Sequence, residues 1–386
     1  MAWNLDLTDL PDLARGAALL GAGGGGDPYL GESLAADALE SAAGHVRFLD
    51  PDELDEDGLV VTTAMLGAPT VLVEKLPNGT EAARALRALE KRLGRPVTAT
   101  MPAECGGMNS MVPLLAAAQL ALPVVDADGM GRAFPELSMT TFGARSMPGS
   151  PMAMADEHGS VAVVETGSDN RRLESLARAL AVSMGASASM AIYPMSGRDV
   201  RRTAVPRTVS TAVRLGRAVR EARERHTDPV AALQEALPHT VYRHGRAVFC
   251  GKVVDVERRT TDGFARGRAL VAADGVRADG TGSDGTVGNG LDGTDGTGTT
   301  CELVFQNENL AARVDGRTVA LVPDLVTVLH ADSGEPVTTE GLAYGQRVRV
   351  FVICAPAQLR TPEALAAFGP RAFGIDEDYH PAVRLA

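Results

Sequence analysis

Two aspartates and an arginine follow a short apolar run that we expect to be a buried strand at 123–126. Asp126 and Asp128 lie two positions apart, and alternate residues of an extended segment face the same side. Two neighbouring carboxylates raise the pKa of one of them toward a value suited to general acid–base catalysis. Arg132 could offset their charge or hold a substrate carboxylate. The pattern indicates a site, although either aspartate alone would also suit an Asx turn.

A second polar segment lies between an expected strand at 97–101 and an expected helix at 108–120. In open α/β sheets, ligands bind in the crevice beyond the carboxyl ends of the strands. The segment offers a carboxylate, an amide and two glycines whose N–H groups can face a ligand: Glu104, Asn109, Gly106 and Gly107. A turn or cap role for Glu104 is the alternative. Cys105 has no nearby histidine to activate it, which favours a packed thiol over a nucleophile.

A glycine-rich segment lies near the N-terminus. Gly21–Gly26 is followed by Asp27 and a proline, which are typical of a helix N-cap and first helical position. A dinucleotide-binding fingerprint requires a strand before its glycines, whereas we expect a helix here, capped by Thr8. Gly24 and Gly25 still allow the backbone to approach a ligand closely. Asp27 suits a helix cap and a ligand-binding role equally well.

The elements that must position these segments alternate between strand and helix through the first half of the chain. The expected strands are 46–49, 60–65, 97–101, 123–126 and 161–165, and the expected helices are 28–43, 81–93, 108–120 and 171–184. Such alternation predicts an α/β layered domain.

The second half of the chain has a different pattern of expected helices and strands. Helices are expected at 208–225 and 229–237, followed by short β-like runs at 248–257, 301–305, 310–314, 319–322, 326–329 and 348–353. We therefore predict an N-terminal α/β domain at 1–190 and a β-rich C-terminal domain at 191–386, with the boundary between residues 183 and 207.

One stretch of the second half has a low-complexity composition. In 274–299, Gly, Asp and Thr supply 19 of 26 residues. The stretch therefore has too few apolar side chains to offset the conformational entropy that a chain loses when it becomes ordered. We interpret it as a flexible surface insertion between paired strands at 266–272 and 301–305. A calcium loop would need a regular period with an apolar residue, which the stretch lacks.

Composition excludes several classes of partner. The chain has 386 residues and a net charge of −12, so nucleic acid and anionic membrane surfaces are poor partners. No apolar run approaches the roughly 20 residues of a membrane span, and the acidic N-terminus does not resemble a secretory signal. Four isolated cysteines suit a reducing compartment, so we expect a cytoplasmic protein. The histidines form no metal-binding motif; no cofactor is predicted, and a divalent metal is left open.

The motifs together closely resemble those of the S-methyl thiohydantoin desulfurase family. The segments that carry the resemblance are 21–29, 104–110, 126–135, 305–309, 323–325 and 369–374. The resemblance spans essentially the whole chain and implies an N-terminal α/β domain, a β-rich C-terminal domain, and kinship with genes for hydantoin and oxoproline breakdown. The chain departs from the family at 206–210, where the expected Pro-Gly-Thr-x-Ser is Pro-Arg-Thr-Val-Ser. The insertion at 274–299 is a second departure.

The resemblance implies a hydrolase that converts an S-methylated thiohydantoin ring to a hydantoin with loss of methanethiol, in ergothioneine-type catabolism. Asp126 or Asp128 would be the general base and Glu104 the acid or second carboxylate. The groups that would bind the hydantoin-like substrate are Asn109, Arg132, Gly106, Gly107, Asp27, Gly24, Gly25 and Thr208.

Two other functions remain open at this point. One is a metal-dependent cyclic-amide hydrolase that uses the aspartates and a distant histidine. The other is a non-catalytic subunit of a hydantoinase or oxoprolinase complex. A homo-oligomer is compatible with the sequence.

Overall fold

The computed structural model describes residues 2–67, 71, 77–261, 263–274 and 299–382. Its first half is built on a mixed sheet of eight strands in the order β1-β2-β5-β4-β3-β9-β7-β8. The strands are β1 Trp3–Asp6, β2 His45–Leu49, β3 Leu59–Gly67, β4 Ala99–Pro102, β5 Val124–Val125, β7 Met152–Ala155, β8 Val161–Val164 and β9 Ser187–Ser196. The four central strands β2, β5, β4 and β3 run parallel, so their carboxyl ends meet at one edge.

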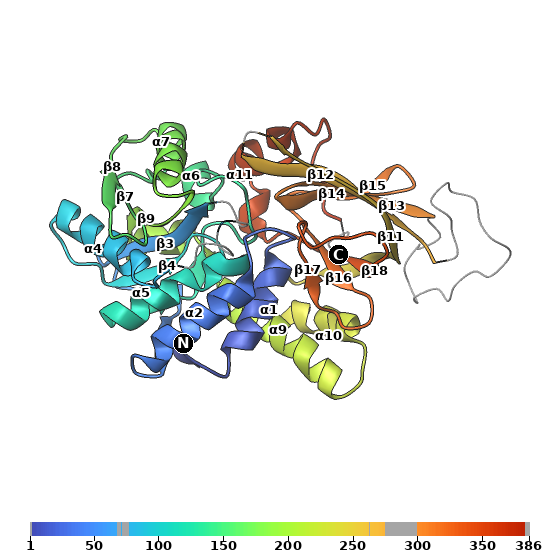
Figure 1. Ribbon diagram of the computed structural model, residues 1–386, viewed down its shortest axis with the longest axis horizontal. Coiled ribbons are helices and arrows are strands. Elements are labelled where there is room, and N and C mark those ends of the chain that lie inside the picture. The colour runs from blue at the N-terminus through green and yellow to red at the C-terminus, as the bar shows by residue number, and fades with distance from the viewer. Residues whose placement is uncertain (1, 68–70, 72–76, 262, 275–298, 383–386) are drawn as a thin grey trace.

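Helices pack against this sheet, as Figure 1 shows. They are α1 Leu10–Leu20, α2 Pro28–Glu40, α4 Glu81–Leu93, α5 Val112–Leu120, α6 Thr141–Ala144, α7 Asn170–Ser183 and α8 Gly197–Thr203. Single 3-10 turns lie at Pro51–Glu53 and Gly107–Ser110. Strands and helices thus form the expected α/β layered architecture.

The second half is built on an antiparallel sheet in the order β15-β14-β13-β12-β11-β18-β16-β17. Its strands are β11 Gly245–Thr261, β12 Phe264–Ala272, β13 Thr300–Gln306, β14 Glu308–Val314, β15 Arg317–Leu321, β16 Leu325–His330, β17 Pro336–Val337 and β18 Arg347–Ile353. Helices and 3-10 turns flank it at α9 Thr208–Glu224, α10 Pro229–Ala236, Leu237–His239, Ala357–Arg360, α11 Pro362–Phe368 and Pro370–Phe373. The expected β-rich second half is confirmed.

Helices α1 and α9 join the two halves. A Cβ on Gly16 would lie 1.8 Å from the carbonyl oxygen of Ala212, and one on Gly216 would lie 1.8 Å from that of Asp12. Only glycine at these two positions lets the helix backbones approach so closely. The same buried cluster includes Leu325 of the second sheet, so one continuous core runs from the first half into the second.

A two-stranded ribbon fixes the segment that carries the paired aspartates. Strand β6 (Ala127–Asp128) pairs antiparallel with β10 (Val205–Pro206), and Val205 lies opposite Asp128. The turn before α9 therefore lies directly beside the aspartate segment.

The structure corrects several local expectations. The first helix begins at Leu10 with Asp9 rather than Thr8 as its N-cap, and strand β1 precedes it. The helix expected from residue 108 begins as a 3-10 turn and becomes α-helical only at Val112. Strands β7 and β9 were not expected.

Strands β12 and β13, which flank the glycine-rich insertion, pair antiparallel from Arg266–Gln306 to Ala272–Thr300, as expected. Residues 275–298 of the insertion lie outside the described residues. The proposed domain boundary at 190 remains a prediction; strand β9, which belongs to the first sheet, ends at Ser196.

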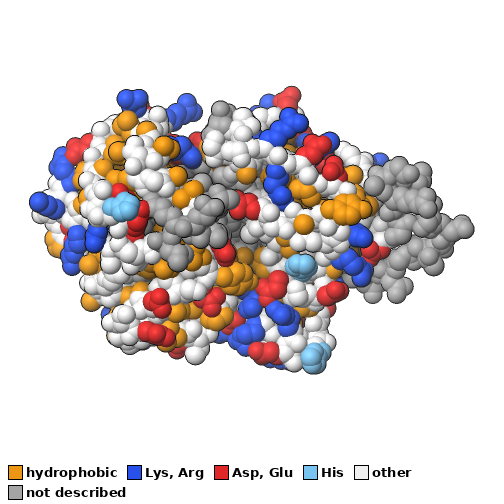
Figure 2. Space-filling model, in the orientation of Figure 1, with side chains coloured by type: hydrophobic (Ala, Val, Ile, Leu, Met, Phe, Trp, Pro, Cys, Tyr) orange, Lys and Arg blue, Asp and Glu red, His pale blue; other side chains and the backbone are white. Residues whose placement is uncertain are grey.

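Acidic and basic side chains lie next to one another on the lower part of the face in Figure 2. Within the described ranges, we find no helix that is both long and apolar enough to cross a bilayer.

Candidate functional site

The glycine-rich loop lies in direct contact with the loop that follows β4. The backbone N–H of Met108 donates to the carbonyl oxygen of Gly25 at 2.8 Å. A Cβ on Gly107 would lie 2.2 Å from that same oxygen, and Gly107 has a left-handed φ of 56°. Glycine is therefore required where the two loops cross.

The start of β14 meets the same glycine-rich loop from the second half of the chain. The backbone N–H of Asn309 donates to the carbonyl oxygen of Ala22 at 2.8 Å. A Cβ on Gly24 would lie 2.3 Å from Oε1 of Glu308. Three segments that are far apart in the sequence thus converge, and the missing side chain of Gly24 makes room for a carboxyl group.

Glu104 is a buried carboxyl group held by two N–H donors. Its Oε1 accepts a hydrogen bond from Nδ2 of Asn109 at 2.6 Å, and its Oε2 accepts one from the backbone N–H of Phe134 at 3.3 Å. The N–H of Met65 donates to Oδ1 of Asn109 at 2.7 Å, which fixes the orientation of the amide. Burial, with a contribution from the charge of Asp128, raises the pKa of Glu104 to about 8.

Glu308 is equally buried but has fewer partners. Its exposed fraction is 3%, and its Oε2 has no hydrogen-bond partner among the described residues. Burial and the charge of Glu104 raise its pKa to about 8. Arg132 is the cation that opposes this shift for both glutamates, and one cation balances only one carboxylate. The pair therefore retains at least one proton at neutral pH.

Asp128 is fully buried and bound by backbone donors. Its Oδ1 accepts from the N–H groups of Gly131 at 2.8 Å and Met130 at 3.2 Å, and its Oδ2 accepts from the N–H of Cys105 at 2.5 Å. Burial nevertheless raises its pKa to about 7. Because both oxygens are engaged, Asp128 ties the loop after β4 to its own loop.

Asp126 points toward the start of α9. Its carboxylate accepts from the N–H of Ser210 at 3.0 Å, and its carbonyl oxygen accepts from the N–H of Arg207 at 2.6 Å. Burial raises its pKa. Asp126 and Asp128 are close enough to interact electrostatically, yet their carboxylates bind different segments.

Arg132 does not serve as a free anion-binding group, which corrects the expectation that it holds a substrate carboxylate. It has no exposed surface, and its guanidinium donates to the carbonyl oxygens of Ala133 at 3.0 Å, Asp324 at 2.8 Å and Asn309 at 2.9 Å. These bonds connect the loop after β6 to the start of β14, at Asn309, and to the residue before β16, Asp324. Arg132 is a buried cross-link and the counter-charge of the neighbouring glutamates. We call Glu104, Asp128 and Glu308, with Arg132, the carboxyl cluster.

The remaining candidate residues divide into two groups. Gly106 packs in the cluster wall, where a Cβ would lie 3.0 Å from that of Ala133. Asp27 is exposed and caps α2 by accepting from the N–H of Tyr29 at 2.9 Å, as one alternative expected. Thr208 is buried at the start of α9, and its hydroxyl has no partner in the part of the chain that the structure describes. Neither side chain hydrogen-bonds to the carboxyl cluster.

Cys105, whose N–H binds Asp128, lies in surroundings that disfavour a nucleophilic thiol. Burial, followed by the charges of Asp128, Asp126 and Glu104, raises the pKa of the Cys105 thiol well above its usual value. A thiol in this state is a poor nucleophile. Across the described ranges, no group of three or more His, Cys, Asp and Glu side chains is arranged to hold a metal ion.

Glu308 lies in the segment 305–309 that carries the family resemblance, but the sequence assigned it no role. The signal was present, because the polar run Gln306–Asn309 interrupts two apolar strands. A carboxyl group there has no local reason to be buried, and only the fold reveals its contact with Gly24.

Comparison with known proteins agrees with this architecture. The S-Me-THD-like N-terminal domain matches residues 8–166 and the S-Me-THD-like C-terminal domain matches residues 168–382. No curated protein sequence matches the chain. A crystal structure of a protein from Chromobacterium violaceum has the same fold, with a TM-score of 0.77 and 24% identity over 99% of this chain and 100% of that one. Because the two domain matches span nearly the whole sequence, the chain belongs to the S-Me-THD-like family.

Proposed function

We propose that this protein is a hydrolase of a hydantoin-like five-membered ring, and that it releases methanethiol from an S-methyl thiohydantoin. The observation that carries the proposal is that Glu104 and Glu308 are both buried, with Arg132 as the cation that acts on both, and that burial raises the pKa of each to about 8. A pair of carboxyl groups with one proton can act as a base and an acid in the same turnover.

The hydrogen bonds suggest which glutamate carries the charge. Two N–H donors face the oxygens of Glu104, and donors stabilise the ionised form of a carboxyl group. Oε2 of Glu308 has no partner among the described residues, which favours the protonated form. We therefore assign Glu104 as the base and Glu308 as the acid, in place of the aspartates, whose carboxylates already accept backbone N–H groups.

The reaction then proceeds in two steps. Glu104 takes a proton from water as its oxygen bonds to the ring carbon that carries sulfur, and Glu308 gives a proton to the adjacent ring nitrogen. The tetrahedral intermediate collapses to a carbonyl, the carbon–sulfur bond breaks, and the proton of the hydroxyl group leaves with methanethiolate as methanethiol. Glu104 then passes the proton it took from water to Glu308 through solvent, which restores the starting state of the pair. A thiolate leaves with little protonation help, so no nucleophilic side chain is needed.

The glycine N–H groups of the two crossing loops and the amide of Asn109 are proposed to polarise the ring. We further propose a cytoplasmic location, because four cysteines isolated in the sequence suit a reducing compartment.

A substrate screen tests the proposal. Purified protein is incubated with hydantoins, thiohydantoins and their S-methyl derivatives, and released thiol is measured. We expect thiol release from an S-methyl thiohydantoin. Failure on every ring, together with co-purification of a larger ATP-dependent partner, would instead support a non-catalytic subunit. Turnover that requires stoichiometric bound zinc, iron or manganese would support a metal-dependent hydrolase.

A further inference from the structure

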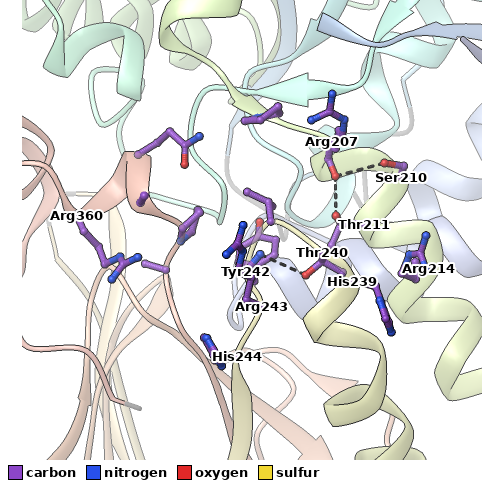
Figure 3. A pocket seen from close by; sticks show the side chains of 16 residues that line it. Arg207, Ser210, Thr211, Arg214, His239, Thr240, Tyr242, Arg243, His244 and Arg360 are labelled. Atoms are coloured by element: carbon purple, nitrogen blue, oxygen red, sulfur yellow. Dashed lines mark hydrogen bonds between the residues drawn. The ribbon is translucent and has the colours of Figure 1, made fainter. Parts of the chain in front are cut away.

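A large cavity lies outside the carboxyl cluster and has the opposite charge. It has a volume of about 710 Å³, which is the size of a small-molecule site. Its walls come from the start of α9, the segment between α10 and β11, and the segment before α11. Figure 3 shows Arg214 and His239 on one side and Arg360 on the other, with Arg243 between them. We call this space the basic cavity.

Only one of the four arginines that line the basic cavity, Arg207, forms an ion pair among the described residues. Four arginines and two histidines line it, and no aspartate or glutamate is among its lining residues. Within the described residues, Arg214, Arg243 and Arg360 form no ion pair or side-chain hydrogen bond, and the buried Nε of Arg360 has no partner. In a protein with a net charge of −12, acids are plentiful, so three arginines around one cavity that form no ion pair with a described residue require another explanation.

The backbone also holds one of these arginines in an uncommon conformation. Arg243 has a φ of 64°, a left-handed value that costs a non-glycine residue about 1 kcal/mol or more. The preceding residue anchors it, because the hydroxyl group of Tyr242 donates to the carbonyl oxygen of Gly131 at 2.5 Å. The cavity wall is thereby bonded to the loop of the carboxyl cluster.

We propose that the basic cavity binds a small anion that carries at least two carboxylate or phosphate groups. The planar guanidinium matches the oxygens of both groups with paired hydrogen bonds. Three arginines on different walls suit a ligand with separated charges rather than a single carboxylate. The site is separate from the carboxyl cluster, and its occupation does not depend on the proposed hydrolysis.

Titration calorimetry on the full chain tests the site, with pyrophosphate and citrate as probes of the phosphate and carboxylate forms. We expect one probe to bind, with an affinity that falls as salt screens the charges. Arg243→Gly suits the left-handed backbone and removes the guanidinium, and we expect it to weaken binding on the order of tenfold or more. Arg360→Gln should do the same and covers the case in which the first variant does not fold. Arg47→Gln is the matched control, because Arg47 is an exposed arginine of β2 that forms no ion pair with the residues that the structure describes.

Binding of pyrophosphate alone would support a phosphate ligand, and binding of citrate alone would support a polycarboxylate. Two results would overturn the proposal. One is no binding of either probe at millimolar concentration by the folded protein. The other is equal binding by the wild type, Arg243→Gly and Arg360→Gln, because the cavity would then not be the site.

Discussion

The carboxyl cluster and the basic cavity both contain ionisable groups that outnumber the nearby groups of opposite charge. They differ in how the excess charge is stabilised. In the cluster, burial raises the pKa of three carboxyl groups, and Arg132 opposes this shift for Glu104 and Glu308. In the cavity, arginines stay charged and remain in contact with solvent. Arginine shows both behaviours: Arg132 is saturated by carbonyl groups, whereas Arg243 is without a side-chain partner in the described part of the chain. An atom without a partner among the described residues distinguishes Glu308 and Arg243 from Arg132, although all three carry ionisable groups.

The largest effect is expected from removing one carboxyl group of the cluster. Glu104→Gln keeps the shape and can still accept from Asn109, but it cannot take a proton. We expect turnover to fall about 10²–10⁴-fold, the usual contribution of acid–base catalysis. Glu308→Gln should cause a loss of similar size. The measurement is kcat/KM for thiol release from the S-methyl thiohydantoin that the screen identifies.

Glu40→Gln is the control, because Glu40 is an exposed acid at the end of α2 and should retain full activity. If Glu308→Gln is as active as the wild type while Asp128→Asn is inactive, the base and acid would have to be sought among the aspartates, as the sequence first indicated.

The structural role of Arg132 predicts a large loss of stability. Arg132→Met removes three hydrogen bonds to carbonyl oxygens and the positive charge that opposes the raised pKa values of Glu104 and Glu308. We expect the free energy of unfolding to fall by about 3 kcal/mol or more, measured by chemical denaturation. Arg47→Gln should change it by less than about 0.5 kcal/mol. Near-normal stability of Arg132→Met would mean that the two halves do not depend on this cross-link.

The cluster also predicts an uncommon dependence of stability on pH. Glu104 and Glu308 have pKa values of about 8, well above those of ordinary glutamates. Between about pH 5 and 8 both carboxyl groups are ionised in the unfolded chain, whereas the folded pair retains at least one proton, so raising the pH favours unfolding. The free energy of unfolding should fall on the order of 1 kcal/mol per pH unit for the proton that the pair retains.

Denaturation at a series of pH values in the wild type and in Glu104→Gln and Glu308→Gln measures this effect. Each variant should flatten the profile across that window. A wild-type profile that is already flat there would show that the two carboxyl groups are ionised in the folded protein.

The amino-acid pattern predicted more of the fold than of the site, and the missed elements show why. Strand β3 has the β-branched run Val60–Thr63, and its prediction held. Strand β9 consists mainly of Ser, Ala and Met, which have little strand preference, and it exists because it pairs with β3 and β7. The residue types of a segment do not indicate which distant strands it pairs with.

The site shows the same limit. The sequence identified Glu104 and Asn109, which come from one loop and hydrogen-bond to each other. It could not show that Glu308 lies against Gly24, because 283 intervening residues separate them. It also assigned Arg132 to a ligand, since only the fold reveals the carbonyl groups that occupy its guanidinium.

The smallest effect is expected from the one arginine of the basic cavity that has partners. Arg207 lines the cavity, but its guanidinium pairs with Asp50 at 2.8 Å and Asp52 at 3.1 Å. Its φ of 59° is left-handed, which explains why the resemblance places glycine at this position. Arg207→Gly loses two ion pairs in which the arginine side chain is 51% exposed, but it relieves the backbone. We therefore expect stability to change by less than about 1 kcal/mol.

The affinity for an anion should distinguish Arg207 from the other arginines of the basic cavity more clearly than the free energy of unfolding does. Because carboxylates already occupy its guanidinium, Arg207→Gly should leave the affinity for pyrophosphate or citrate within about twofold, whereas Arg243→Gly should weaken it on the order of tenfold. Both substitutions place glycine at a left-handed position, so they differ in the pairing of the guanidinium rather than in the backbone. An equal loss in the two variants would mean that total positive charge, and not the absence of a carboxylate partner, determines which arginines bind the anion.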